Sequence, residues 1–417
     1  MTDSTGCEPR AHRIPVAPIA LAAAITILDG FDAFSFSLMA PQIGATLRIP
    51  TASLGVIFAS VMAGMILGAI AGGALADRLG HLRVLYVALA LFGASALALS
   101  LVSSTGLTGV DVISLNRLIS GMGLGAAAPI AVGLLNQSSE RPPSELIIAL
   151  VWAGIPLGGT LAALYKYAFV PVGAWRSIFV LGGILPLFVG LFAYRIFRDL
   201  RPSGNAVAPG RTKVTELFTH GQVWVSFAIT SMFFVGYVTT SIIVNWLPTV
   251  LTRRAASPFA IFATFGAINA GSVLGMVALG LVAARTRVRY LLPWVWAAAG
   301  LCGLAAGIGK LGTTSLALLA IGSYTIGAGA QALSVALAND IYRERGIETT
   351  AIGFMTGSGR LGQACALAAS GAVISFLGRE AAVFGIAGAS ACVAALFAVL
   401  ALRSRTRTSI QKVTECS

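Results

Sequence analysis

The chain has 417 residues, of which 57% are hydrophobic and only 10% are charged, and its mean hydropathy is +0.88. A soluble protein of this length needs many more polar residues to cover its surface, so the composition excludes an ordinary soluble enzyme or binding domain. The net charge of +13 is strongly basic, and the positions of the basic residues decide whether nucleic acid or a membrane explains it.

Apolar stretches of about 20 residues recur along the whole chain, and each is long enough to cross a hydrocarbon core about 30 Å thick. Twelve such segments are predicted, centred near residues 27, 65, 93, 122, 157, 185, 234, 270, 299, 324, 362 and 391. The sequence therefore predicts an all-α integral membrane protein with twelve transmembrane helices.

The basic residues are distributed unevenly between the two sides of the predicted membrane. With both termini placed inside, 19 Lys and Arg residues fall on the cytoplasmic side and seven fall outside, namely Arg48, Lys166, Arg176, Arg253, Arg254, Lys310 and Arg379. Such a bias sets membrane topology and needs no nucleic acid to explain it. We expect a monomeric multi-pass protein of a bacterial-type inner membrane, surrounded by lipid, with both termini cytoplasmic.

A polar stretch in the middle of the chain divides the segments into two sets of six. Residues 197–222 combine Pro, Gly and charged residues, which is typical of a flexible linker. The expected parts are a tail at 1–13, a bundle at 14–196, this linker, a second bundle at 223–402 and a tail at 403–417. A six-plus-six layout is typical of carriers whose substrate site lies between two repeats near the middle of the membrane.

Two acids stand out in the first segment, which runs roughly over residues 14–39. Asp29 and Asp32 lie inside it, although a charge near the bilayer centre costs about 2.5–3.5 kcal/mol. They are three residues apart, so they lie on neighbouring positions of one helix. The chain's histidines, His12, His81 and His220, all fall in tails or loops. We predict that the two aspartates carry a coupling proton, with the division of roles between them left open.

The predicted loop after the second segment carries a glycine and charge pattern. Gly73, Asp77, Arg78, Gly80 and Arg83 resemble the signature of the major facilitator superfamily, except that His81 stands where that pattern has Arg or Lys. The resemblance implies a role in conformational gating rather than in substrate binding. An ordinary basic loop would explain Arg78 and Arg83 but not the acid and the two glycines.

Two arginines lie inside apolar segments and need an anion, since Arg stays protonated in proteins. Arg117 precedes glycines at 121, 123 and 125, which let another helix pack closely. Its expected partners are Asp29 and Asp32, and the alternative is that it snorkels outward beside Asp111. Arg360 lies in the eleventh segment, and either binds substrate or has a structural role near the cytoplasmic end. Together with the two acids, these arginines make a neutral interior.

Several other polar residues are candidates for substrate binding. Candidate cavity residues are Tyr237 and Asn245 in the seventh segment and Gln331 in the tenth. The alternatives are a core role for Tyr237, an interfacial belt and helix stop for the run Asn245–Pro248, and a bridge between helices for Gln331. The run Gly154–Gly159 partly resembles the Gly-Pro motif of facilitator-type antiporters, with a different spacing. We interpret it as packing and a kink, and keep antiport as an alternative.

The motifs taken together resemble the aromatic acid:proton symporter family of the major facilitator superfamily. The resemblance rests on runs spread over nearly the whole chain, namely Asp29–Asp32, Gly73–Arg83, Arg117–Pro129, Trp175–Phe179, Asn245–Pro248 and Gly359–Gly362. It implies the major facilitator fold, two six-helix halves, and import of benzoate-, hydroxybenzoate- or phenylpropanoate-type acids with protons. In that reading the Trp175 run is an interface anchor, since Trp is enriched there.

Other functions remain as alternatives to aromatic acid import. The protein could export drugs or metabolites by proton antiport, or carry a non-aromatic organic acid. We expect no enzyme activity, catalytic residue, metal or cofactor, because no nucleophile–base pair or ligand cluster falls near the membrane. The proton is the expected coupling ion.

Overall fold

A computed structural model describes residues 16–137, 151–171, 174–198, 217–218, 223–285, 290–308, 311–342, 347–377 and 381–415. These residues form twelve helices in the order of the predicted segments: α1 (Val16–Thr46), α2 (Thr51–Leu79), α3 (His81–Ser100), α4 (Gly106–Gln137), α6 (Gly154–Phe169), α7 (Arg176–Arg198), α8 (Val223–Arg253), α9 (Pro258–Arg285), α10 (Leu292–Ile308), α11 (Thr313–Tyr342), α12 (Glu348–Leu377) and α13 (Ala382–Glu415). The prediction of an all-helical protein is confirmed for this part of the chain.

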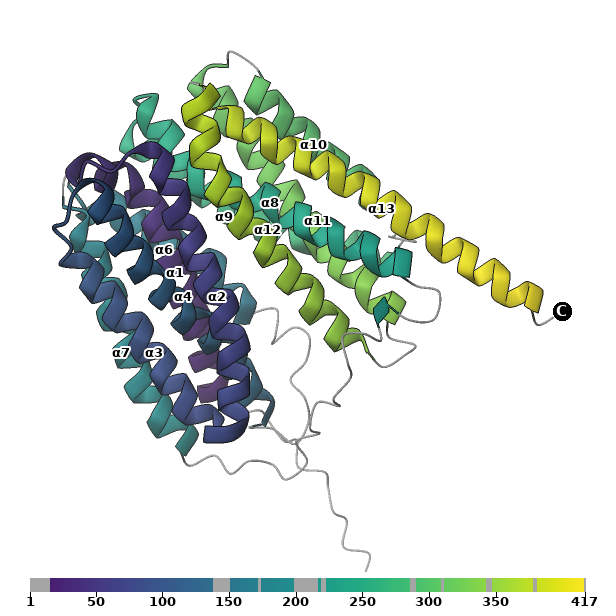
Figure 1. Ribbon diagram of the computed structural model, residues 1–417, viewed down its shortest axis with the longest axis horizontal. Helices are drawn as coiled ribbons and strands as arrows, with labels where there is room; N and C mark the ends of the chain where they lie inside the picture. The colour runs from purple at the N-terminus through teal and green to yellow at the C-terminus, as the bar shows by residue number, and fades with distance from the viewer. Residues whose placement is uncertain are drawn as a thin grey trace, which may run out of the picture.

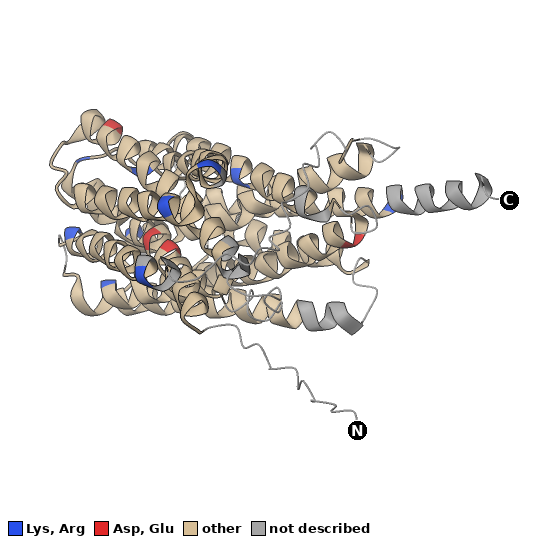
Figure 2. Cartoon of the chain, turned by 90° about the horizontal axis from the view of Figure 1, so that it is seen from below, with Lys and Arg blue, Asp and Glu red and all other residues tan. Residues whose placement is uncertain are grey.

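Most of the helices suit a lipid environment. Nine of those described are long and apolar enough to cross a membrane by length and composition, and α10 is a shorter apolar helix. The sides of several helices expose large apolar residues, such as Leu274, Trp294 and Phe376. Few positions along the described helices are charged residues (Figure 2). Such a surface is suited to hydrocarbon rather than to water.

The helices gather into two bundles, one made of α1 to α7 and the other of α8 to α13 (Figure 1). Most of the expected linker at 197–222 lies outside the described residues. α13 continues to Glu415, through the range 403–415 that was expected to be a tail, and extends past its bundle (Figure 1). No Gly or Pro occurs after Gly388, so nothing in this part of the sequence ends the helix.

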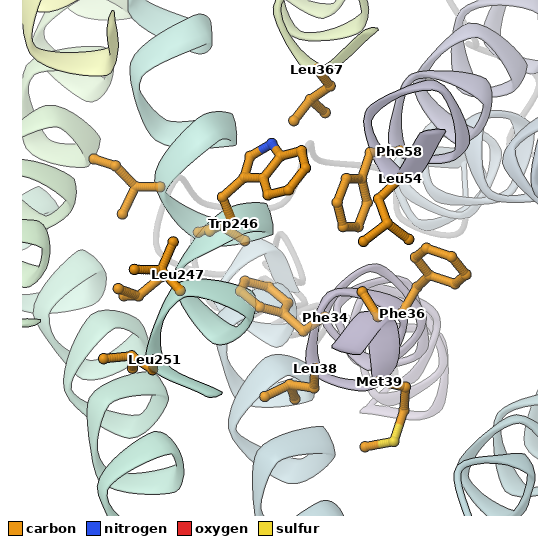
Figure 3. Close-up of a cluster of buried hydrophobic side chains, with 14 of the residues drawn as sticks. Phe34, Phe36, Leu38, Met39, Leu54, Phe58, Trp246, Leu247, Leu251 and Leu367 are labelled. Atoms are coloured by element: carbon orange, nitrogen blue, oxygen red, sulfur yellow. The ribbon is translucent and has the colours of Figure 1, made fainter. Parts of the chain in front are cut away.

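The two bundles meet at one end, which we call the joined end. Phe34 of α1 packs edge-on against Phe265 of α9, with ring centroids 6.0 Å apart, and Phe58 of α2 packs against Trp246 of α8 at 5.7 Å. Figure 3 shows this contact, with side chains from α1 and α2 facing those of α8 and α12. Arg253 at the end of α8 also donates a hydrogen bond to the Thr51 hydroxyl at the start of α2.

Away from the joined end, toward the chain termini, the ribbons of the two bundles diverge (Figure 1). Farther along α2 and α12 the bundles still contact each other, where Arg360 lies beside Met65. This arrangement positions the site described below.

Glycines set the spacing of the helices that carry the site. A Cβ added at Gly121 or Gly125 of α4 would collide with the backbone of α2, and one at Gly123 would collide with α3. The prediction that these glycines allow close packing is therefore confirmed. α4, with its arginine, is consequently held tightly within the first bundle.

Candidate functional site

Asp32 and Arg117 form a buried ion pair between α1 and α4. Arg117 Nη1 donates to Asp32 Oδ1 at 3.0 Å, and Nη2 lies 2.9 Å from Oδ2. The side chains are only 2% and 1% exposed. The guanidinium also lies over the Phe36 ring, 5.1 Å from its centroid. One hydrogen bond and a second close contact between the opposite charges make a tight ion pair, so the two charges cancel locally.

Arg117 is therefore not a snorkelling residue. The alternative that it reaches the outer interface beside Asp111 is wrong, because Asp111 is exposed whereas Arg117 is fully enclosed. The physical reason is the tight packing of α4, which turns the guanidinium toward α1.

Asp29 lies one turn earlier on α1 and is in a different situation. Its side chain is 7% exposed and makes no hydrogen bond or ion pair with any residue that the structure describes. Arg360 and Asp32 are the charged groups that act on it electrostatically. Gly30, between the two acids, lies against the backbone of Ile155 in α6, where any Cβ would collide. The close α1–α6 contact thus fixes the orientation of both acids.

Arg360 of α12 reaches across to the other bundle. Its Nη1 lies 3.4 Å from the Met65 sulfur of α2, which is a weak acceptor. The side chain is partly exposed, and no carboxylate among the described residues lies within ion-pair distance of it. Arg360 therefore holds an uncompensated charge in the middle of the molecule, close enough to Asp29 and Tyr237 to influence both.

Tyr237 of α8 forms an aromatic wall beside this arginine. Its ring packs on Gly359, where a side chain would collide with it, and lies nearly parallel to the Phe233 ring at 6.4 Å. The side chain of Thr356 in α12 lies close to the Tyr237 hydroxyl. A planar ring with a carboxylate could lie along this wall and reach Arg360.

The two predicted amide residues have different surroundings. Asn245 Oδ1 accepts a hydrogen bond of 2.8 Å from Ser37 of α1, and its Nδ2 donates to the Ser241 carbonyl at 2.9 Å. Its amide thus links the two bundles near the joined end, and its role toward substrate stays a prediction. Gln331 of α11 is partly exposed and donates to the Thr240 hydroxyl at 3.3 Å.

The predicted gating residues lie where α2 ends and α3 begins. Gly80 joins the two helices with φ of 93°, a conformation that favours glycine, and its N–H bonds to the Ala76 carbonyl. Arg78 and Arg83 are exposed, and the side chain of Asp77 lies outside the described residues. A Cβ at Gly73 would meet nothing within 4 Å, so no helix lies close to it in this conformation. The gating role itself stays a prediction.

Sequence reasoning did not single out Met65, Thr240, Thr356 or Ser37. Each lies in an apolar segment, and its polar neighbour comes from a helix that is distant in the sequence. The run Gly154–Gly159 packs against α1, with Gly154 beside Thr26 and Gly158 beside Ile27. This supports its interpretation as a packing motif. Within the described ranges, no group of three or more His, Cys, Asp or Glu side chains is placed to hold a metal.

Comparison with known proteins identifies the family of this chain. Residues 22–347 match the sequence pattern of the Major Facilitator Superfamily. The chain belongs to the major facilitator superfamily. The predicted fold class is therefore confirmed, and the protein is a membrane transporter rather than an enzyme.

This transporter is similar in sequence to bacterial carriers of aromatic acids. It is 28% identical over 387 residues to a 4-hydroxybenzoate transporter of Pseudomonas putida, covering 85% of each chain. It is 26% identical over 352 residues to the 3-(3-hydroxy-phenyl)propionate transporter of Escherichia coli, covering 82% of this chain and 83% of that one. Among solved structures, a D-xylose-proton symporter superposes with a TM-score of 0.75 at 17% identity, over 93% of this chain and 97% of the other.

Proposed function

We propose that this transporter is a proton-coupled symporter that imports a small aromatic carboxylate by alternating access. The observation that carries the proposal is that the interior charges differ in whether they are paired. One aspartate and one arginine neutralise each other, whereas Asp29 and Arg360 remain without a partner among the described residues. The similarity to carriers of hydroxybenzoate and hydroxyphenylpropionate supports the substrate class.

Arg360 binds the substrate carboxylate in this mechanism. A guanidinium matches a carboxylate in geometry, and Arg360 has only a thioether beside it to compete. The ring of the substrate packs on Tyr237, whose own ring is held between Phe233 and Gly359. Arg117 is excluded from this role because its guanidinium is occupied by Asp32.

Asp29 carries the proton. A carboxylate already neutralised by an arginine has less to gain from a proton than one with no partner, and only Asp29 is of the second kind. The interior has two acids and two arginines, so it is neutral when empty. Entry of one organic anion makes it negative, and uptake of one proton restores neutrality. Substrate and proton thus move together because either alone leaves a charge inside a membrane.

The meeting of the bundles at the joined end supports alternating access. With the basic side of the chain in the cytoplasm, the joined end faces outward and the diverging end faces the cytoplasm. Substrate is released inward in this conformation, and a second conformation opens the joined end. We place the protein in a bacterial inner membrane with both termini cytoplasmic, as a monomer without cofactor or nucleic-acid partner.

The test is uptake by proteoliposomes of labelled benzoate, 4-hydroxybenzoate, 3-phenylpropanoate and short aliphatic acids under an imposed pH gradient. We expect the aromatic acids to accumulate when the interior is alkaline, and the accumulation to vanish with a protonophore. A response to aliphatic acids alone would overturn the substrate class. Accumulation with the opposite gradient would identify an antiporter, which no feature of the site favours.

A further inference from the structure

A second polar pair lines the same interior, one turn of α8 beyond the aromatic wall. Gln331 of α11 and Thr240 of α8 contact each other, and Thr240 follows Tyr237 by three residues, a rise of about 4.5 Å. α8, α11 and α12 contact one another in pairs. Arg360, Tyr237 and the Gln331–Thr240 pair therefore follow one another across the inner surface of the second bundle.

The hydrogen bonds of Thr240 fix which end of the Gln331 amide faces it. The Thr240 hydroxyl donates its only proton to the Tyr237 carbonyl at 3.3 Å, so its oxygen can only accept from Gln331. Gln331 Nε2 is the donor, at 3.3 Å. The amide oxygen, Oε1, consequently points away from Thr240, and no described residue donates to it.

Gln331 is partly exposed, so its amide oxygen is not sealed off by the surrounding helices and can accept from a bound molecule. It is an acceptor, so a group with an O–H or N–H donor complements it, and on an aromatic acid that donor is a ring hydroxyl. A carboxylate is excluded here, because two acceptors repel each other.

We infer that the Gln331–Thr240 pair is a specificity-determining element that recognises a hydroxyl group on the ring of the substrate. The inference rests on the proposed function: the carboxylate lies on Arg360, the ring lies along Tyr237, and the ring hydroxyl donates to Gln331 Oε1. Thr240 acts as a positioning residue, because it holds the amide in the orientation that presents this oxygen. An acid with an unsubstituted ring leaves Oε1 without a donor and is therefore a poorer substrate.

The experiment compares kcat/KM for labelled 4-hydroxybenzoate, 3-hydroxybenzoate and benzoate in proteoliposomes under one fixed pH gradient. We expect the wild type to prefer at least one hydroxylated acid over benzoate. Gln331→Met keeps the length of the side chain and removes the amide, and should lower this preference by about threefold to tenfold while benzoate uptake is largely kept. Thr240→Val should lower the preference by a smaller factor, because the Gln331 amide loses the hydroxyl that orients it.

Ser334→Ala is the matched control. It removes a polar group one turn along α11, where the hydroxyl bonds to the Ala330 carbonyl and Trp296. It should leave the preference unchanged. In parallel, the wild type in detergent should show a larger rise in unfolding temperature with the preferred hydroxybenzoate than with equal benzoate, which tests recognition without any variant.

Three results would overturn the inference. A wild type that does not prefer either hydroxylated acid excludes recognition of a ring hydroxyl. An equal loss of all three acids in Gln331→Met and Thr240→Val shows that the pair only bridges two helices. Both of these leave aromatic acid import intact, whereas a wild type that takes up none of the three acids refutes the proposed function and this inference with it.

Discussion

The two aspartates of α1 are one turn apart, yet they have opposite environments. Asp32 lies in an ion pair with Arg117, whose guanidinium lies over Phe36, between helices of one bundle. Asp29 is within electrostatic range of Arg360, which belongs to the other bundle and, among the described residues, hydrogen-bonds to the Met65 sulfur. We call the first the closed couple and the second the open couple. The closed couple holds a bundle together, and the open couple lies where the bundles separate.

The difference shows how one acidic motif can serve both stability and transport. A fully enclosed charge cannot exchange protons or bind substrate without breaking its pair. A charge between two bodies that move relative to each other can do both. The following variants test this division.

Arg117→Met should have the largest effect, because it leaves Asp32 enclosed and unpaired. Removing one member of a buried pair costs about 3–5 kcal/mol of folding stability. We expect low yield, a clearly lower unfolding temperature in detergent and no uptake. The double variant Arg117→Met/Asp32→Asn should regain most of the unfolding temperature, since no charge is then left alone. Equal stability of the single variant and the wild type would contradict the closed couple.

Asp29→Asn should abolish accumulation while leaving the fold intact. The carboxylate has no partner among the described residues, so its neutral analogue removes no interaction that stabilises the bundle. We expect the unfolding temperature of the wild type, exchange of substrate without a gradient, and no dependence of uptake on external pH. In the wild type, uptake should rise as the outside is acidified. Accumulation by the variant at the wild-type level would assign the proton to Asp32.

Arg360→Gln should raise KM for aromatic acids by about tenfold to a hundredfold, the value of a hydrogen bond to a charged group. The unfolding temperature should change little, because the arginine makes no ion pair with a described residue. Arg360→Lys keeps the charge but not the fork of two donors, and should be intermediate. A severe loss of stability without a change in KM would show that Arg360 is structural.

Met65→Leu should have the smallest effect. The two side chains are similar in volume, and the sulfur is a weak acceptor for Arg360. We expect KM to change by less than about threefold and the unfolding temperature to stay near that of the wild type. A larger change in KM would mean that Met65 positions the Arg360 guanidinium. Arg360 would then be held more firmly than its weak contact with the sulfur indicates.

The sequence predicted the helices and the four interior charges well, because both depend on local rules. A bilayer requires about 20 apolar residues per span, and a charge inside such a span is visible at once. The pairing of the charges was not predictable, since Arg117 and Asp32 are 85 residues apart and only the packing of α4 on α1 selects Asp32.

The surroundings of single residues could not be predicted from the sequence either. Trp175 was expected to anchor an interface but is fully buried, with its ring against Phe179. Its place in the turn just before α7, rather than its residue type, decides that the ring is buried. Asn245 was a candidate cavity residue, and its amide is hydrogen-bonded at both ends to Ser37 and Ser241. Hydrogen-bond partners 208 residues away leave no mark on the local sequence.

The glycines of α2 and α12 differ between the two ends of the molecule. At the joined end, Gly55 and Gly371 have no room for a Cβ, whereas Gly73, Gly353 and Gly357 have nothing within 4 Å of theirs. A methyl group at these three positions is therefore sterically silent in the conformation described here. Any slowing of turnover by alanine at 73, 353 or 357 has to arise in a state of the transport cycle other than this one. Alanine substitutions at these positions therefore test the conformation in which the joined end has opened.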